Sequence, residues 1–163
     1  MYQAYDLSLS FAVPELLKTK GQVVVLASGA AQIRCPNASE YCTSKHAILR
    51  FAEFIKIGKY SSSPIRTKMP ISRRFAEYPD IKVFAVDPGA VQTDMFDEFS
   101  GPIQPNSTPE LAASTIQYVT SGKADYLNGR FVSSTWDLGE VERDWKEKIV
   151  AQNSLVSKLS LPV

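Results

Sequence analysis

The sequence predicts an α/β domain built on a parallel sheet, and two observations carry this prediction. The β-branched runs at 22–27 and 81–86 are continuously hydrophobic, as in strands that are buried on both faces. Apolar residues at helical spacing fill residues 38–57, between the two runs. Strands that alternate with helices in this way favour parallel pairing. With 44% hydrophobic and 21% charged residues among 163, the composition fits a single domain, 1–163, with its own core.

The chain before the first strand is predicted to be helical. Residues 3–19 place apolar side chains close to a helical stripe, which Pro14 perturbs. Gly21 follows a lysine-rich last turn and is expected to end this helix.

The C-terminal third continues the alternation of helices and strands. Ser107-Thr108-Pro109-Glu110 has the S-x-x-E form of a capping box, which predicts a helix over 109–120. Residues 129–134 form a third predicted strand, and a final helix is expected over 138–150.

Residues 58–74 interrupt this pattern. They are basic, rich in serine and proline, and without a period, so we predict a disordered insertion. Two origins fit this stretch: a family-specific insertion, or intron sequence read as coding. Gly58-Lys59-Tyr60 can be encoded GGT-AAG-TAT, which contains the splice-donor sequence GTAAGT. Messenger RNA that is continuous across codons 55–77 would exclude the intron origin.

Charge and hydropathy exclude several classes of function. The net charge is +1 with acidic and basic residues interleaved, which predicts no nucleic-acid partner and no membrane-surface partner. No apolar run approaches the roughly 18 residues that a membrane span needs. The N-terminus lacks the basic and apolar regions of a secretory signal, so we expect a cytoplasmic protein. Cys35, Cys42 and His46 lack metal-site spacing; we predict reduced thiols and no metal.

The strongest chemical signal is Tyr41-Cys42-Thr43-Ser44-Lys45, a Y-x-x-x-K within a predicted helix. The i, i+4 spacing places the phenol and the ammonium on one helix face. An ordinary tyrosine has a pKa of about 10 and is a poor acid–base group near neutrality. A neighbouring cation favours the phenolate, which makes such a pair suited to proton transfer. By itself the motif also fits a surface tyrosine beside a solvated lysine.

Two further features place this pair in a site. Ser28 ends the first predicted strand, thirteen residues before Tyr41. Residues 87–95, Asp-Pro-Gly-Ala-Val-Gln-Thr-Asp-Met, follow the second strand. Sites in open α/β sheets form outside the carboxyl ends of the strands, so we expect both segments at one edge.

These residues together resemble the short-chain dehydrogenase/reductase family. The segment 22–31 is similar to the family's strand that ends in a catalytic serine, and Tyr41 to Lys45 matches its Y-x-x-x-K. Residues 87–95 resemble its P-G-x-x-x-T segment. The stretch 129–137 is similar to members from filamentous fungi that act in secondary metabolism. The resemblance implies the C-terminal part of a doubly wound, parallel-sheet Rossmann fold.

The resemblance also implies a role for each matching residue. Tyr41 would exchange a proton with the substrate oxygen, and Ser28 would hydrogen-bond that oxygen. Lys45 would stabilise the phenolate and bind the nicotinamide ribose. The residues expected to contact NADP or NAD are Tyr41, Lys45, Pro88, Gly89, Val91 and Thr93. The implied reaction interconverts a ketone and a secondary alcohol of a small-molecule substrate.

The sequence departs from the family pattern before Ser28. No G-x-x-x-G-x-G precedes this residue, and the strands that would carry it are expected to be missing, N-terminal to the present chain. We therefore expect the chain alone to bind the cofactor weakly and to have little oxidoreductase activity. The first predicted strand would become an edge with an exposed apolar flank.

Alternatives to the redox function remain at this point. The chain could be a non-redox pseudoenzyme or a dimerisation module, because the family pairs through two long helices that match 3–19 and 38–57. It could also be a cofactor-free isomerase or dehydratase that uses Ser28, Tyr41 and Lys45. The sequence before Met1 would discriminate these, since a glycine-rich turn there would favour the redox enzyme.

Overall fold

A computed structural model describes residues 2–56, 80–97 and 103–159, so the predicted insertion at 58–74 lies outside the described residues. Three parallel strands form the sheet: β1 (Gln22–Leu26), β2 (Lys82–Asp87) and β3 (Phe131–Ser133), in the order β1-β2-β3. Leu26 pairs with Val86, and Ala85 pairs with Phe131. The predicted parallel sheet is therefore confirmed, although β3 is shorter than expected.

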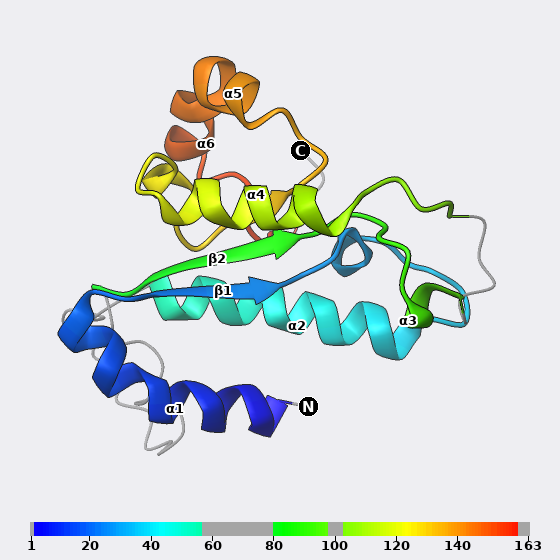
Figure 1. The fold of residues 1–163 in the computed structure, drawn as a ribbon, viewed down its shortest axis with the longest axis horizontal. Coiled ribbons are helices and arrows are strands. Elements are labelled where there is room, and N and C mark those ends of the chain that lie inside the picture. The colour runs from blue at the N-terminus through cyan, green and yellow to red at the C-terminus, as the bar shows by residue number, and fades with distance from the viewer. Residues whose placement is uncertain (1, 57–79, 98–102, 160–163) are drawn as a thin grey trace.

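Helices cover both faces of this sheet (Figure 1). On one side lie α1 (Tyr2–Thr19) and α2 (Ser39–Lys56), and the short turn η1 (Gly29–Gln32) lies between β1 and α2. On the other side lies α4 (Pro109–Thr120), followed by η2 (Asp125–Leu127) and by α5 (Leu138–Glu140), η3 (Val141–Trp145) and α6 (Lys146–Ala151). A short helix, α3 (Asp94–Asp97), follows β2. This two-sided α/β arrangement is that of a partial doubly wound fold.

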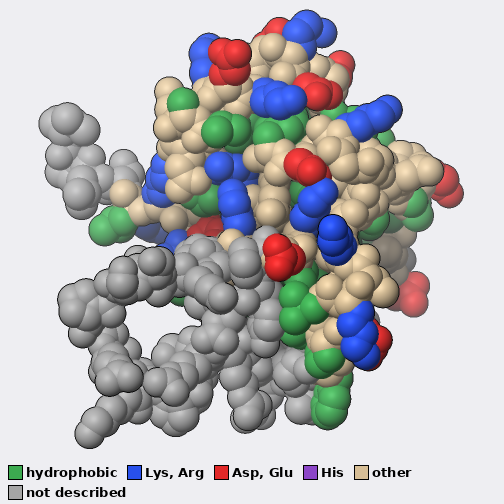
Figure 2. Space-filling model, turned by 90° about the vertical axis from the view of Figure 1, so that its left-hand side faces the viewer, with side chains coloured by type: hydrophobic (Ala, Val, Ile, Leu, Met, Phe, Trp, Pro, Cys, Tyr) green, Lys and Arg blue, Asp and Glu red, His purple; other side chains and the backbone are tan. Residues whose placement is uncertain are grey.

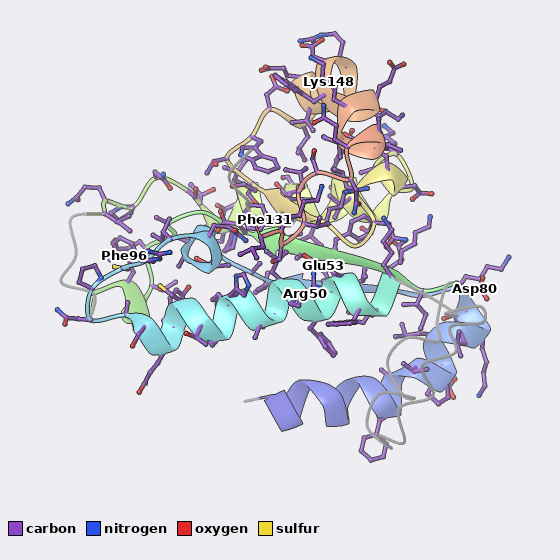
Figure 3. All side chains as sticks on the ribbon, turned by 180° about the vertical axis from the view of Figure 1, so that it is seen from behind. Arg50, Glu53, Asp80, Phe96, Phe131 and Lys148 are labelled. Carbon is purple, nitrogen blue, oxygen red and sulfur yellow. The ribbon has the colours of Figure 1, made fainter. Side chains whose placement is uncertain are left out.

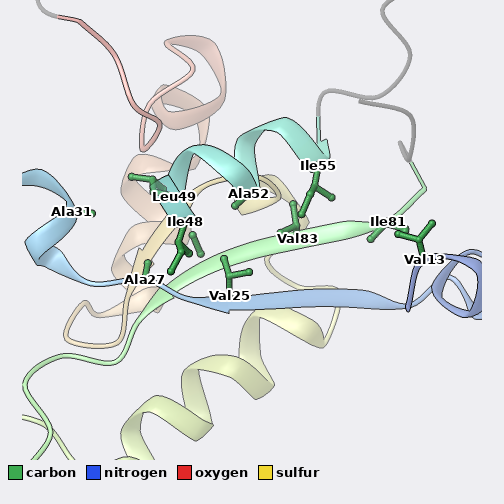
Figure 4. Close-up of a cluster of buried hydrophobic side chains, with 11 residues drawn as sticks. Val13, Val25, Ala27, Ala31, Ile48, Leu49, Ala52, Ile55, Ile81 and Val83 are labelled. Carbon is green, nitrogen blue, oxygen red and sulfur yellow. The ribbon is translucent and has the colours of Figure 1, made fainter. Parts of the chain in front are cut away.

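The central strand β2 separates two hydrophobic cores. Val83 and Ala85 pack with α2, Val25 and Val13 of α1 (Figure 4). Phe84 and Val86 face the opposite cluster, which includes residues of α4 and α6. The alternation follows from strand geometry, because successive side chains point to opposite faces. All four residues from Val83 to Val86 are fully buried.

The first strand differs from its prediction. Only Val25 of β1 is buried, and Leu26 is 51% exposed. The prediction of burial on both faces therefore holds for β2 and not for β1. Strand β1 lies at the edge of the sheet formed by the described residues. The expected apolar edge is confirmed for this sheet.

Helix boundaries follow the predictions with local corrections. The predicted 109–120 helix is confirmed, but its N-cap is Thr108 and not Ser107: the Thr108 hydroxyl accepts from the Leu111 N–H at 3.3 Å. The predicted 138–150 helix forms as a continuous stretch with a π-helical turn, η3. Helix α1 contains Pro14, as expected. It ends at Thr19, and the next residue, Lys20, has the left-handed conformation, with φ of 51°.

No helix among the described residues combines the length and the apolar character that crossing a membrane requires. Lys, Arg, Asp and Glu side chains are interspersed over the described part of the face in Figure 2, as the net charge of +1 suggests.

Candidate active site

Polar groups from four elements meet at the carboxyl edge of the sheet. Ser28 follows β1, Asp87 ends β2 and Ser133 ends β3, while Tyr41 and Lys45 lie in the N-terminal half of α2. The Ala27 N–H donates to the Val86 carbonyl at 2.8 Å, so the chain segments after β1 and β2 stay adjacent. A Cβ placed on Gly29 would lie 3.7 Å from Oδ2 of Asp87. The predicted adjacency of the segments at Ser28 and at 87–95 is confirmed.

Ser28 is held by the turn that it starts. Its backbone is extended, with φ of −165° and ψ of 151°, and it caps η1. The hydroxyl oxygen accepts from the Ala30 N–H at 3.1 Å, and the Ser28 carbonyl accepts from the Ala31 N–H at 2.9 Å. A serine hydroxyl can donate one hydrogen bond while it accepts others, so this geometry leaves its proton available for an oxygen atom.

Tyr41 and Lys45 share one face of α2, as their spacing predicts. The Lys45 Nζ lies 5.7 Å from the centroid of the Tyr41 ring, and Tyr41 is 37% exposed. The ammonium also donates to the Leu26 carbonyl at 2.8 Å, which ties α2 to the end of β1. Partial burial lowers the pKa of Lys45, and the negative charge of Asp87 opposes this effect.

The turn after β2 is held in place by Asp87 and by the segment at Ser107. Gly89 has φ of +78°, and a Cβ there would lie 2.1 Å from Oγ of Ser107. The Gly89 N–H donates to Oδ1 of Asp87 at 3.2 Å, and Val91 forms a parallel bridge with Ser107. Further along, the Phe96 N–H donates to the Thr93 hydroxyl at 3.3 Å, at the start of α3.

The histidine and the cysteines, for which the sequence predicts no metal site, have ordinary structural surroundings. A ring nitrogen of His46, Nδ1, lies 2.9 Å from the Ala31 carbonyl. Both cysteines are free, and Cys42 is buried. Among the described residues there is no group of three or more histidine, cysteine or acidic side chains that could hold a metal.

Two functional contacts were not predicted from the sequence. Asp87 was read only as part of a turn signal, although a charged residue at the end of a buried strand is itself a signal. The bond from Lys45 to the Leu26 carbonyl has no sequence signal, because any residue could supply that carbonyl.

A family model described as short chain dehydrogenase matches residues 7–102. The chain belongs to the short-chain dehydrogenase family. Short chain dehydrogenase pigC of Monascus ruber is 32% identical over 160 residues, which make up 94% of this chain and 46% of that protein. This relative supports the predicted likeness to fungal members. 11-beta-hydroxysteroid dehydrogenase-like 3 of Arabidopsis thaliana is 42% identical over 85 residues, or 52% of this chain and 22% of that protein.

This short-chain dehydrogenase spans about half the length, 46%, of relatives such as pigC. A solved 7α-hydroxysteroid dehydrogenase, complexed with NADH and 7-oxo glycochenodeoxycholic acid, matches with a TM-score of 0.54 and 20% identity. The match covers 77% of this chain and 47% of that one. At this identity the likeness concerns the fold, and it agrees with the sheet and helix layers described above.

Proposed function

We propose that this chain carries the catalytic edge of an NAD(P)-dependent oxidoreductase that interconverts a ketone and a secondary alcohol. The observation that carries this proposal is the placement of Tyr41 and Lys45 on one face of α2, beside the end of β1 that leads into Ser28. We propose a small substrate from fungal secondary metabolism, because 129–137 resembles fungal members of the family and a Monascus protein is among the relatives, and we propose a cytoplasmic site of action.

The residues present suit the nicotinamide end of such a cofactor. Lys45 has three N–H donors, and its described hydrogen bond to Leu26 uses one of them, so others can bind ribose hydroxyls. The turn that contains Pro88, Gly89, Val91 and Thr93 follows the central strand, where open α/β sheets bind ligands. When bound, the reduced nicotinamide would supply the hydride for the carbonyl carbon and become oxidised.

The remaining steps belong to this chain's own side chains. The Ser28 hydroxyl donates to the substrate oxygen and stabilises the negative charge that develops on it. Tyr41 gives its proton to that oxygen, which forms the alcohol, and takes it back in the reverse direction. Lys45 stabilises the resulting phenolate through its positive charge. Attachment to the Leu26 carbonyl limits the positions available to this ammonium.

The test is calorimetric binding of NADH and NADPH to the 163-residue chain, followed by reduction of a test ketone. We expect weak cofactor binding and low turnover, and the Tyr41→Phe variant should lose that turnover by roughly a hundredfold or more. Binding by Tyr41→Phe should persist, since the phenol hydroxyl is not the main anchor. Turnover that is equal in both proteins would show that Tyr41 is not the acid–base group.

We further propose that the protein forms homo-oligomers through α1 and α2. Phe11 on α1 is 75% exposed and Phe54 on α2 is 46% exposed, so each helix presents a large apolar side chain to solvent. Burying them against a second copy would remove this apolar surface from water. Sedimentation of the wild type and of Phe54→Asp tests this proposal. A wild type that stays monomeric at all concentrations would contradict it.

A further inference from the structure

We propose that Asp87 is a positioning residue of this site, whose carboxylate holds the Pro88-Gly89 turn and acts through its charge on the Lys45 ammonium. The inference rests on the proposed function, because it gives Asp87 a part in the proton transfer assigned to Tyr41 and Lys45. It concerns a side chain at the end of the central strand that the proposed mechanism does not otherwise use.

The Asp87 carboxylate connects two loops of the carboxyl edge. Oδ1 accepts from the Gly89 N–H at 3.2 Å, and Oδ2 accepts from the Ser133 hydroxyl at 3.0 Å. The Ser133 hydroxyl also lies 3.0 Å from that of Thr135. In addition, the Asp87 carbonyl accepts from the Ser134 N–H at 2.8 Å. The carboxylate is therefore held between β2 and the loop after β3 and cannot swing away without breaking these bonds.

The Asp87 carboxylate lies at the same edge of the sheet as the Lys45 ammonium. A Cβ on Gly29, just after Ser28, would lie 3.7 Å from Oδ2 of Asp87. Lys45 itself is bonded to Leu26, whose strand partner Val86 precedes Asp87. The carboxylate is thus close enough to act electrostatically on the ammonium, in the direction that favours its charged form.

Other charges do not share this role among the described elements that pack against Lys45. The segment 22–32, which carries β1 and η1, contains no charged residue. Ser133 of β3 and Thr135, from the loop after it, are neutral. On α2 itself the neighbouring titratable groups are Tyr41, the buried thiol of Cys42, and His46, which is directed at Ala31. Asp87 is the carboxylate that offsets the desolvation of Lys45 in this part of the chain.

A purely structural role of Asp87 and a role in positioning Lys45 predict different results. If Asp87 only capped the turn, its charge would not matter, because asparagine offers the same carbonyl oxygen to the Gly89 N–H. If it positions Lys45, its charge matters and the turn alone is not enough. Asp87→Asn therefore separates the two roles better than a truncation to alanine.

The experiment measures the titration of each lysine in the full chain. Trace acetylation with acetic anhydride across neutral to alkaline pH, followed by peptide mass mapping, gives the midpoint for Lys45, with Lys45→Arg identifying its peptide. In Asp87→Asn we expect this midpoint to move to lower pH. Asp125→Asn removes a similar charge from an exposed ion pair with Lys82, 2.7 Å long, and should leave the Lys45 midpoint in place.

Ser133→Ala provides the second comparison. It removes one hydrogen bond to Asp87 but no charge, so it should lower thermal stability with little change in the Lys45 midpoint. Circular dichroism shows whether each variant is folded. If Asp87→Asn does not fold, Asp87→Glu keeps the charge but moves it, and any change in the Lys45 midpoint then reports the position of the carboxylate.

The outcomes separate this inference from the proposed function. A Lys45 midpoint that is unchanged in folded Asp87→Asn would overturn the inference, whatever the enzyme activity. Absence of ketone reduction by the wild type counts against the proposed function alone. Where turnover is present, Asp87→Asn should lower it by roughly tenfold and shift its pH profile.

Discussion

Gly89 is the residue on which the shape of the turn after β2 depends. Its φ of +78° lies in the left-handed region, and Ser107 fills the space in which a side chain would lie. The neighbouring Asp87 and Ser107 are thereby brought close to the backbone of the turn. A single residue type is required here for two separate reasons, conformation and space.

We expect Gly89→Ala to destabilise the fold by roughly 3 kcal/mol, since strain and a clash combine. Gly122→Ala is the matched control, because Gly122 has φ of +89° with nothing within 4 Å of an added Cβ. This control should cost only about 1 kcal/mol from strain. Urea unfolding gives both values. Equal losses of stability in the two variants would mean that Ser107 moves aside without cost. If the Gly89→Ala loss is larger, adding Ser107→Gly should recover part of it.

Tyr118 gives the fold a predictable response to alkaline pH. Burial raises the pKa of Tyr118 to about 12, and its hydrogen bond of 2.8 Å to Glu142 adds to the effect. The neutral phenol is thus favoured in the folded state relative to an unfolded pKa of 10.0. Its contribution to stability is complete below pH 10 and is lost as the pH rises through about 12.

Urea unfolding of wild type and Tyr118→Phe between pH 9 and 12 tests this response. The wild type should lose stability with rising pH more steeply than Tyr118→Phe, which has no phenol to ionise. Parallel curves for the two proteins would exclude Tyr118 as the source.

At the scale of elements, side chains of α2 hold the segment that follows α6. Glu53 of α2 is 6% exposed and accepts from the Ser157 N–H at 2.6 Å, while Arg50 pairs with it at 2.5 Å. Figure 3 labels Arg50 and Glu53 on α2, with Phe131 of β3 nearby. The Phe131 N–H donates to the Leu155 carbonyl at 2.9 Å, so the segment after α6 follows the outer edge of β3 and is fastened to α2.

Replacing Glu53 by leucine should cost about 2 kcal/mol in urea unfolding, because the Ser157 N–H loses its acceptor and Arg50 loses its partner. Glu53→Gln keeps an acceptor oxygen and should cost less. Hydrogen exchange at Ser157 reports the tail directly and should accelerate more in Glu53→Leu than in Glu53→Gln. A stable Glu53→Leu with unchanged exchange would contradict the role of Glu53.

Helix α4 begins at Thr108, and its stability depends on that cap. Thr108→Ala removes the acceptor for the Leu111 N–H and should cost about 1 kcal/mol, while Thr108→Ser should cost much less. Thermal unfolding measures both variants. If Thr108→Ala and Thr108→Ser behave alike, the methyl group and not the hydroxyl stabilises this helix start.

At the scale of the whole molecule, stability is concentrated around β2. The two hydrophobic clusters lie on its opposite faces, and of the α1 side chains that the structure describes, Val13 and the half-buried Leu16 join them. Phe11 and Leu17 of the same helix are exposed, at 75% and 40%. Few buried apolar contacts among these described side chains of α1 imply a low free energy of local opening.

Amide hydrogen exchange followed by mass spectrometry should therefore show α1 opening well before β2 in the protein at low concentration. Exchange in β2 should follow global unfolding, since its residues Val83–Val86 are fully buried. Raising the protein concentration should protect α1 if it pairs with a second copy, as proposed. Equal protection of α1 and β2 at every concentration would contradict this distribution of stability.

Local sequence signals were enough to predict the order and type of the main elements and the residues of the candidate site. β-branched runs, helical periodicity and the Y-x-x-x-K spacing are local properties, so 22–27, 38–57 and the Tyr41–Lys45 pair could be predicted from their own residues. Local signals also placed Ser28 and 87–95 at the ends of strands, and the parallel alternation implied a shared edge.

The burial of each strand and the bonds that hold the site come from packing between distant parts of the chain. The runs that form β1 and β2 read alike, and only the family resemblance predicted the edge for β1; the burial of β2 on both faces depends on neighbours that are distant in sequence. For the same reason the bonds from Lys45 to Leu26 and from Ser133 to Asp87 could not be predicted. They join residues 19 and 46 positions apart, and only packing of the chain brings them within hydrogen-bond distance.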